Sequence, residues 1–299
     1  MKEPKEVIIL THSSKFHTDD VFAVATLILL LEKEHKIKII RSREPSFLAT
    51  ADYVVDKGGI DDQKTNRFDH HQEGGAGGRK NAVPYSSFGL VWKKFGKNLC
   101  GSQEVADKVD KELVQPIDLY DNGIKYLETN IKNIHPFDIN KLIDAFRPTW
   151  KENNDIDDVF MEVVLYSKTL LLKEIKHIKD EHEAVGLVIN AYNNSPDKKV
   201  IELDERWPWG ETLVQFPEPI FVIYKKRVDN DWSIKTIRDD IFSYNARKDL
   251  PKAWAGKRDE ELEKVTGVPG SVFCHNGRFI AVAKTKEAIL KLAQIALND

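Results

Sequence analysis

The sequence has few cysteines and no dominant charge. Its 299 residues include only two cysteines, Cys100 and Cys274, which lie far apart. A disulfide framework or a cysteine-rich metal site needs several closely spaced cysteines, so we expect neither of these and no disulfide-linked partner. The 45 lysines and arginines nearly balance the 48 aspartates and glutamates, for a net charge of −3. This balance argues against a globally basic nucleic-acid coat but is compatible with a local basic groove.

Long hydrophobic runs are also missing. The longest apolar run, residues 21–31, is too short to cross a bilayer. Residues 1–6 have neither the apolar stretch of a signal peptide nor the Arg- and Ser-rich pattern of a transit peptide. We therefore expect a cytoplasmic protein with no membrane partner. At 41% hydrophobic residues, the chain can form one large domain or two of ordinary size.

The first half of the sequence alternates strand and helix patterns. Apolar, β-branched runs at residues 7–10, 37–40 and 53–56 predict strands, and residues 21–32 predict an apolar helix between the first two. Such alternation is typical of an α/β fold with a parallel sheet.

A long helical pattern separates this half from a C-terminal part with short strand-like segments. It begins near Asp157 and ends at the polar turn 193–197. We therefore predict a catalytic domain (1–165), a linking helix (166–192) and a smaller α+β C-terminal domain (193–299). Four strand-like pieces, a hairpin with Asn-Gly at its turn and a terminal helix are expected in that last domain, at residues 200–203, 213–216, 220–225, 233–237, 272–282 and 286–297.

Histidines and aspartates follow the predicted strands of the first half. His12, His17 and Asp19 follow the first strand, Asp56 ends the third, and a loop follows with the run Asp69-His70-His71. Ligand sites of open α/β sheets lie at the carboxyl ends of the strands, so we expect these side chains to meet. Mixed carboxylate and imidazole ligands suit Mn²⁺, Zn²⁺ or Fe²⁺ better than Ca²⁺. Any one of these histidines alone would be better explained as a surface or capping residue.

Two further carboxylates lie one turn apart on a predicted helix. Asp118 and Asp121 share one helix face, and Gly123 is expected to end that helix. They are either solvated surface charges or the final ligands of a metal site.

These motifs resemble the DHH phosphoesterase superfamily. The resemblance rests on His12…His17-Thr18-Asp19, on residues 55–59 and on Asp69-His70-His71-Gln72. Within the superfamily the sequence is similar to the Myg branch, the melanocyte-proliferating-gene-type 3′–5′ exonucleases. Further patterns of that branch occur in matching order at residues 86–90, 121–124, 250–262 and 267–275.

The resemblance implies a set of metal ligands and of residues that orient them or contact the substrate. Two divalent ions, Mn²⁺ in preference to Mg²⁺, would be held by His12, His17, Asp19, Asp56, His70 and Asp121. Asp56 would bridge the ions, and Asp118 is the reserve candidate for the last ligand. His71 would lie beside the ions or contact the substrate, and Asp69 would orient a histidine.

The resemblance also implies phosphate contacts in the C-terminal domain. Arg247, Arg258 and His275 would face the phosphate chain of a bound substrate. Two positions depart from the family pattern: Ser14 and the pair Ala281-Val282 stand where glycines are typical.

The residues and the resemblance together predict metal-assisted phosphoester hydrolysis. The first hypothesis is a 3′–5′ exonuclease that acts on single-stranded RNA or short oligonucleotides in a cleft between the two domains. A small-molecule phosphoesterase or pyrophosphatase would use the same metal centre. A third hypothesis, from a different class, is a metal-stabilised nucleic-acid-binding protein without catalysis.

Overall fold

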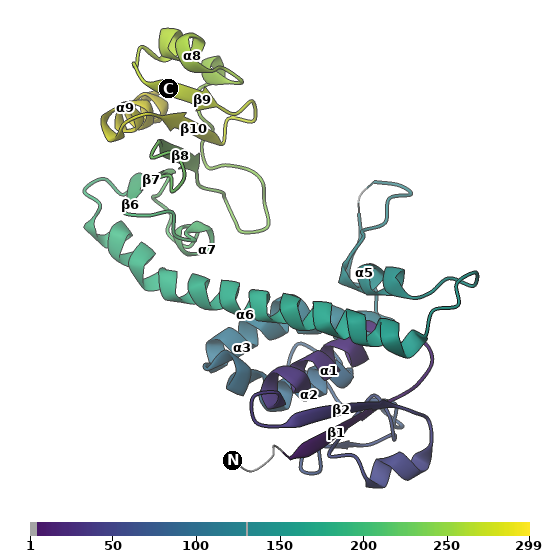
Figure 1. The fold of residues 1–299 in the computed structure, drawn as a ribbon. Helices are drawn as coiled ribbons and strands as arrows, with labels where there is room; N and C mark the ends of the chain where they lie inside the picture. The colour runs from purple at the N-terminus through teal and green to yellow at the C-terminus, as the bar shows by residue number, and fades with distance from the viewer. Residues whose placement is uncertain (1–4, 130) are drawn as a thin grey trace. The chain divides into compact units, whose positions relative to one another are not determined.

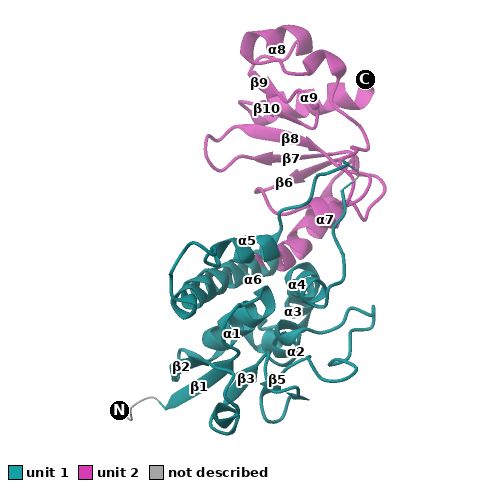
Figure 2. Cartoon of the chain, turned by 90° about the vertical axis from the view of Figure 1, so that its right-hand side faces the viewer, with its two compact units in different colours: residues 1–179 teal, residues 180–299 magenta. Residues whose placement is uncertain are grey.

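The computed structural model describes residues 5–129 and 131–299 as a mixed α/β chain with two compact units, Met1–Lys179 and Asp180–Asp299 (Figure 2). Each unit contains one five-stranded sheet. The helix α6 (Ile156–Asn194) is 39 residues long and crosses the boundary between the units. The segment 166–192, predicted as a linking helix, therefore lies inside one longer helix that contributes to both units.

The first unit carries the predicted parallel sheet. Its elements before α6 are β1 (Glu6–Thr11), α1 (Thr18–Leu31), β2 (Lys36–Arg41), η1 (Pro45–Ala49), β3 (Tyr53–Val55), β4 (Asp61–Asp62), β5 (Arg67–Phe68), α2 (Ser87–Cys100), α3 (Gln103–Val109), η2 (Asp110–Val114), α4 (Gln115–Asp121) and α5 (Ile139–Phe146). The strand order is β2-β1-β3-β5-β4, in which β4 alone runs antiparallel to its neighbour. The carboxyl ends of β1, β3 and β5 therefore lie at one edge.

The two faces of this sheet are covered differently. Val7 and Ile9 of β1 point into the core shared with α1, α2 and α6, whereas Ile8 and Leu10 point to the face covered by η1. This alternation is the period of two that a β-strand requires. Figure 1 shows α1 and α2 against the sheet. Helix α1 is buried on nearly all sides, which explains why its sequence is apolar all round.

Helix α1 begins at Thr18, three residues before the apolar run from which it was predicted. Its N-cap is His17. The carboxylate of Asp20 accepts a hydrogen bond from the backbone N–H of His17 at 2.9 Å. Asp19 and Asp20 thus both lie in the first turn, where the helix dipole favours negative charge.

The second unit forms a mostly antiparallel sheet with helices on both faces. Beyond α6 its elements are β6 (Val200–Leu203), α7 (Gly210–Leu213), β7 (Phe221–Lys225), β8 (Trp232–Thr236), η3 (Lys252–Trp254), α8 (Asp259–Thr266), β9 (Ser271–Cys274), β10 (Ile280–Ala283) and α9 (Lys286–Asn298). The strand order is β6-β7-β8-β10-β9, and only β6 and β7 pair in parallel. One face packs on α8 and α9, and the other packs on α7 and the end of α6.

The predicted hairpin is confirmed, but one predicted strand is wrong. β9 and β10 pair antiparallel on either side of the loop that contains Asn276-Gly277. Residues 213–216 form no strand, because Leu213 closes the short helix α7 with a backbone hydrogen bond to Trp209. The Leu213 side chain is buried from that helical turn. A short apolar run does not distinguish a strand from a buried helical turn.

Among the helices in the described ranges, none combines the length and the apolar character that a membrane span requires.

Candidate metal centre

The carboxyl edge of the first sheet gathers the predicted ligands. His12 follows β1, Asp56 follows β3, and His70 and His71 lie just beyond β5. Because these strands are parallel neighbours, their ends place the three loops side by side. Asp121, the last residue of α4, completes the cluster from a helix.

Three groups of side chains in this cluster are close enough to hold a metal ion. The groups are His12, His17 and Asp56; Asp56, His70 and His71; and His17, Asp19 and Asp121. Within each group the potential ligand atoms lie within 4.8 Å of one another. Asp56 and His17 each belong to two groups, so the three groups form one continuous centre.

Asp56 lies at the middle of this centre. Its Oδ2 is 3.3 Å from Nε2 of His12, and its Oδ1 is 3.5 Å from Nε2 of His70. Nε2 of His70 is in turn 3.0 Å from Oδ2 of Asp121. The two oxygens of one carboxylate thus face imidazoles from opposite sides of the cluster.

The backbone at Asp56 is strained, and helix α2 supports its side chain. The φ angle of Asp56 is 53°, in the left-handed region that few non-glycine residues adopt. Oγ of Ser87 donates a hydrogen bond to Oδ1 of Asp56 at 2.9 Å, and the Ser87 N–H points to Oδ2 of Asp19 at 3.3 Å. The positive N-terminal end of α2 therefore faces two carboxylates of the centre.

The loop before α1 also contains a left-handed residue. Ser14, which stands where the family pattern has glycine, has a φ angle of 74°. Its carbonyl accepts a hydrogen bond from Nη2 of Arg41 at 2.7 Å. The loop therefore keeps the conformation that a glycine would favour, and the neighbouring strand β2 supports it.

Asp69 holds the exposed imidazole of His71. Oδ1 of Asp69 lies 2.8 Å from Nδ1 of His71 and accepts the backbone N–H of the same residue at 3.1 Å. Its Oδ2 accepts the N–H of Gly59 at 2.6 Å. Asp69 is buried, while 62% of the His71 side chain is exposed. A buried carboxylate thus fixes the orientation of an imidazole at the open side of the centre.

The two buried histidines have strongly perturbed pKa values. Burial by itself would lower the pKa of His12, but the carboxylates of Asp20 and Asp56 raise it to about 10. Burial likewise opposes protonation of His70, and Asp121 and Asp56 raise its pKa to about 10. Both imidazoles therefore interact more strongly with the surrounding negative charge than with the apolar core.

The carboxylates of the centre have pKa values that are shifted in opposite directions. Burial, followed by the charges of Asp56 and Asp121, raises the pKa of Asp19 well above its usual range. Burial would also raise the pKa of Asp56, but the neighbouring His12 and His70 hold it well below that range. This pattern shows a concentration of negative charge that protons must balance.

Divalent ions fit this donor set. Nε2 of His12, Nε2 of His70 and Oδ1 of Asp19 are buried. The two nitrogens face carboxylate oxygens at 3.0–3.5 Å, so these buried groups are satisfied only when a proton or a cation lies between them. Metal coordination would satisfy all three atoms. Because ligands must be deprotonated, an ion would take the place of the protons that balance the carboxylates. Nitrogen and oxygen donors together favour Mn²⁺, Zn²⁺ or Fe²⁺ over Ca²⁺.

Asp118 belongs to none of the three groups. Its Oδ1 accepts hydrogen bonds from Oγ of Ser86 and, at 3.1 Å, from the N–H of Gly89. Its Oδ2 forms an ion pair with Nη1 of Arg79 at 2.8 Å. Burial raises the pKa of Asp118 to about 6 against the opposing effects of Arg79 and Ser86. The structure thus gathers Asp121 with the candidate ligands and turns Asp118, the reserve candidate, towards the start of α2.

The three residues expected to contact phosphate all lie in the second unit. Arg247 donates hydrogen bonds of 2.6–2.8 Å to three backbone carbonyls in residues 214–219. Its guanidinium therefore supports the loop after α7, which leaves little of its donor capacity for a ligand.

Arg258 and His275 are more exposed. The guanidinium carbon of Arg258 lies 4.3 Å from the ring centroid of Phe273, and Arg258 is the N-cap of α8. His275 accepts a hydrogen bond at Nδ1 from the N–H of Gly277, and its ring lies 4.4 Å from that of Phe279. These residues keep free donor or ring surface in the part of the chain described.

Sequence reasoning missed several residues around the centre. Asp20, the neighbour of the candidate ligand Asp19, is fully buried with Oδ2 3.1 Å from Nε2 of His12. Ser87, at the start of α2, contacts Asp56 through its hydroxyl group. Arg43 and Lys57 line a cavity of about 320 Å³ beside the centre. The doubled aspartate of Asp19-Asp20 was the one available signal.

The model of the MYG1 exonuclease family, described as "Uncharacterised protein family (UPF0160)", matches residues 8–297. The chain belongs to the MYG1 family. The MYG1 protein of Saccharomyces cerevisiae is 31% identical over 97% of this chain and 95% of its own length. The human protein named MYG1 exonuclease is 29% identical over 96% of this chain and 85% of its own length. The resemblance to this family inferred from the motifs is thereby confirmed.

The solved structures add less. An exopolyphosphatase-related protein of Bacteroides fragilis matches 99% of this chain and 92% of its own at 12% identity, with a TM-score of 0.23. A score this low supports no conclusion about a shared structure or activity.

Proposed function

We propose that the protein is a divalent-metal-dependent phosphodiester hydrolase, a 3′–5′ exonuclease acting on single-stranded RNA or short oligonucleotides. The observation that carries the proposal is the continuous cluster of imidazoles and carboxylates centred on Asp56. Relatives over nearly the whole chain are named exonucleases, which supports hydrolysis of a nucleic-acid chain. The polarity and the preference for RNA rest on the family resemblance.

The cluster is suited to two Mn²⁺ ions. His12 and His17 would hold one ion and His70 the other, with Asp56 shared between them. Asp19 and Asp121, which group with His17, would complete the set. Ions at these positions would activate the attacking water and offset the charge that develops on the phosphoryl oxygens. The division of ligands follows from the two oxygens of Asp56, which face different imidazoles.

His71 would act on the substrate from the open side. With its Nδ1–H donated to Asp69, its Nε2 is left with a lone pair. That nitrogen can accept a hydrogen bond from the attacking water or hold the proton that the leaving oxygen takes. Asp69 would then stabilise the protonated imidazole without moving.

Positive charge beside the centre would orient the phosphate. Arg43 is exposed in the cavity, and its guanidinium suits a bidentate contact with a phosphate. Lys57 donates a hydrogen bond of 3.1 Å to the backbone carbonyl of Glu44 and one of 2.6 Å to that of Ser42, so it is held at the same wall.

A small-molecule phosphoesterase is the second candidate. The cavity beside the centre is about 320 Å³, near the lower limit of small-ligand sites. It can therefore take a single nucleotide as well as the end of a chain.

The deciding experiment is hydrolysis of end-labelled single-stranded RNA with added Mn²⁺. We expect a ladder that shortens by one nucleotide at a time from the 3′ end. Asp56→Asn should abolish it, whereas Asp158→Asn, a charge-matched change at an exposed position, should not. An inert polymer together with turnover of a dinucleotide or pyrophosphate would favour the second candidate. Full activity of Asp56→Asn would contradict both.

A further inference from the structure

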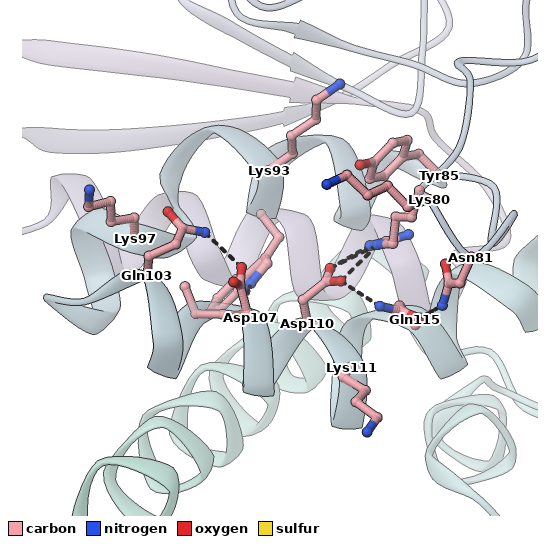
Figure 3. Close-up of a pocket in the computed structure, with 13 residues that line it drawn as sticks. Lys80, Asn81, Tyr85, Lys93, Lys97, Gln103, Asp107, Asp110, Lys111 and Gln115 are labelled. Carbon is pink, nitrogen blue, oxygen red and sulfur yellow. Dashed lines mark hydrogen bonds and ion pairs between the residues drawn. The ribbon is translucent and has the colours of Figure 1, made fainter. Parts of the chain in front are cut away.

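A second, larger cavity lies in the first unit beside α2. Its volume is about 600 Å³, and its walls come from the loop before α2, from α2 itself, from α3 and from the π-helical segment η2 (Figure 3). We call it the basic groove. No residue of the metal-ligand groups lines it.

The basic groove concentrates positive charge in a chain whose net charge is negative. Its lining holds five cationic side chains and two carboxylates, against −3 for the whole sequence. Arg79 is neutralised by Asp110, but the four lysines are exposed: Lys80, Lys93, Lys97 and Lys111. In the described part of the chain, no ion pair with a carboxylate is seen for any of these lysines. Such a concentration of unpaired cations attracts a polyanion.

The floor beneath the lysines is rigid. Arg79, whose side chain is 9% exposed, donates Nε to Oδ2 of Asp110 at 2.8 Å, and Gln115 donates to the same oxygen at 2.7 Å. The indole N–H of Trp92 donates to the carbonyl of Ala106 at 3.0 Å. Figure 3 shows the Asp110 contacts between Lys80, Lys93 and Lys97 on one side and Lys111 on the other. The exposed cations thus project from a surface that is already fixed, which reduces the entropy that binding would cost.

Two of the lysines are spaced for a repeating anion. Lys93 and Lys97 are four residues apart on α2, so they project from one face on successive turns. Nζ of Lys93 lies 4.9 Å from the ring centroid of Tyr85, which holds it over the groove. The guanidinium carbon of Arg79 lies 4.3 Å from the centroid of the same ring, so this tyrosine is already in contact with two cations. The groove is therefore built for phosphates more than for stacked bases.

Two contacts join the groove to α4, the helix that ends at Asp121. The side chain of Asn122, next to Asp121, donates to the carbonyl of Tyr85 at 3.3 Å. Arg79 also forms an ion pair with Asp118, one turn before Asp121 on α4. The groove therefore begins at the helix that supplies a candidate metal ligand.

We propose that the basic groove binds the phosphate backbone of a single-stranded nucleic acid, at nucleotides beyond the one being hydrolysed. This inference rests on the proposed exonuclease function and adds to it a second contact region that favours chains over dinucleotides. Lys80, Lys93, Lys97 and Lys111 make the contacts. The binding is sequence-independent, because phosphates carry no base information.

The test is binding of a labelled single-stranded RNA of about 12 nucleotides, in chelator so that nothing is cut. The variant replaces Lys80, Lys93, Lys97 and Lys111 by glutamine. Losing four phosphate contacts should lower the slope of log Kd against log salt by about 2.8 and raise Kd at low salt at least about tenfold. The matched control replaces four exposed lysines outside the groove: Lys33, Lys36, Lys38 and Lys64.

The outcomes separate this inference from the proposed function. Loss of binding in the groove variant alone supports the inference, even if the wild type hydrolyses no RNA, in which case only the proposed function fails. Unchanged binding in the groove variant, or an equal loss in the control, overturns the inference. Competition by inorganic polyphosphate as strong as by RNA overturns the assignment to nucleic acid. In Mn²⁺, the groove variant should keep wild-type turnover of a dinucleotide while it loses the advantage of longer strands.

Discussion

The metal centre and the basic groove lie in the same unit and handle charge in opposite ways. The centre places carboxylates such as Asp19 and Asp20 fully out of solvent and balances them with imidazoles. The groove leaves its lysines in water, and only part of its Arg79–Asp110 pair is accessible to solvent. A buried charge needs a partner within the fold, whereas a charge in water is already solvated and can bind a ligand from solution. A single substitution in the metal centre should therefore have a large effect. In the groove, the effect should depend on how many lysines are replaced.

The largest effect should come from removing the arginine that supports the groove. Arg79→Met leaves the fully buried Asp118 and the partly exposed Asp110 without their cation, and breaking a buried pair in this way costs about 3–5 kcal/mol. Urea unfolding of the variant would measure this loss. Arg67→Met, which removes only hydrogen bonds to backbone carbonyls, is the control and should cost less. Equal losses of unfolding free energy in the two variants would show that the ion pairs of Arg79 add no more stability than ordinary hydrogen bonds.

The next largest effect should be the stabilisation of the folded protein by metal ions. An ion that binds the folded protein alone stabilises it by about 2.7 kcal/mol at a concentration 100 times its Kd. We expect Mn²⁺ to raise the melting temperature of chelator-treated protein and Ca²⁺ to raise it less, because the donors include nitrogen. Thermal unfolding with each ion measures this. If Mn²⁺ and Ca²⁺ act equally, the imidazoles are not ligands.

A smaller effect should separate two adjacent serines. Ser87→Ala removes the hydrogen bond to Asp56, and losing such an outer partner lowers metal affinity about 10- to 100-fold. Ser86→Ala removes a hydrogen bond to Asp118 instead and should reduce stability while metal affinity is kept. Metal titrations and unfolding curves on both variants test this. The same loss of metal affinity in both would mean that Asp118 acts on the centre.

The smallest effect belongs to single lysines of the groove. Lys97→Gln should change the free energy of unfolding by less than about 0.5 kcal/mol, because the side chain is exposed and has no carboxylate partner among the described residues. It should still lower the salt slope of RNA binding by about 0.7. A large loss of stability would show that this lysine has a structural role.

Local patterns predicted the sheet and the edge at which the candidate ligands meet. The apolar run at residues 7–10 predicts β1, and His12 and His17 lie in the loop that follows it. Parallel pairing then brings His12 and Asp56 to one edge without further information. The β9–β10 hairpin was readable for a similar reason, since its turn residues lie between two apolar runs.

The missed features depend on contacts between distant residues. Arg79 and Asp110 are 31 residues apart, and no local pattern indicates that they pair. Ser87 has the signature of a helix cap, yet its hydroxyl bonds a carboxylate from another loop. The sequence also could not decide between Asp118 and Asp121, which share a helix face. Only the packing of α4 turns Asp118 towards Arg79 and Asp121 towards His70.

The left-handed backbone of Asp56 is a strain that its ion pairs offset. A non-glycine residue held there costs of order 1–3 kcal/mol. Asp56→Gly would relieve that strain, but it would also leave the buried His12 and His70 without the carboxylate that they share, and breaking a buried pair costs about 3–5 kcal/mol. A laboratory selection for heat tolerance in the absence of metal should therefore retain the aspartate at this position, even when turnover is not part of the selection.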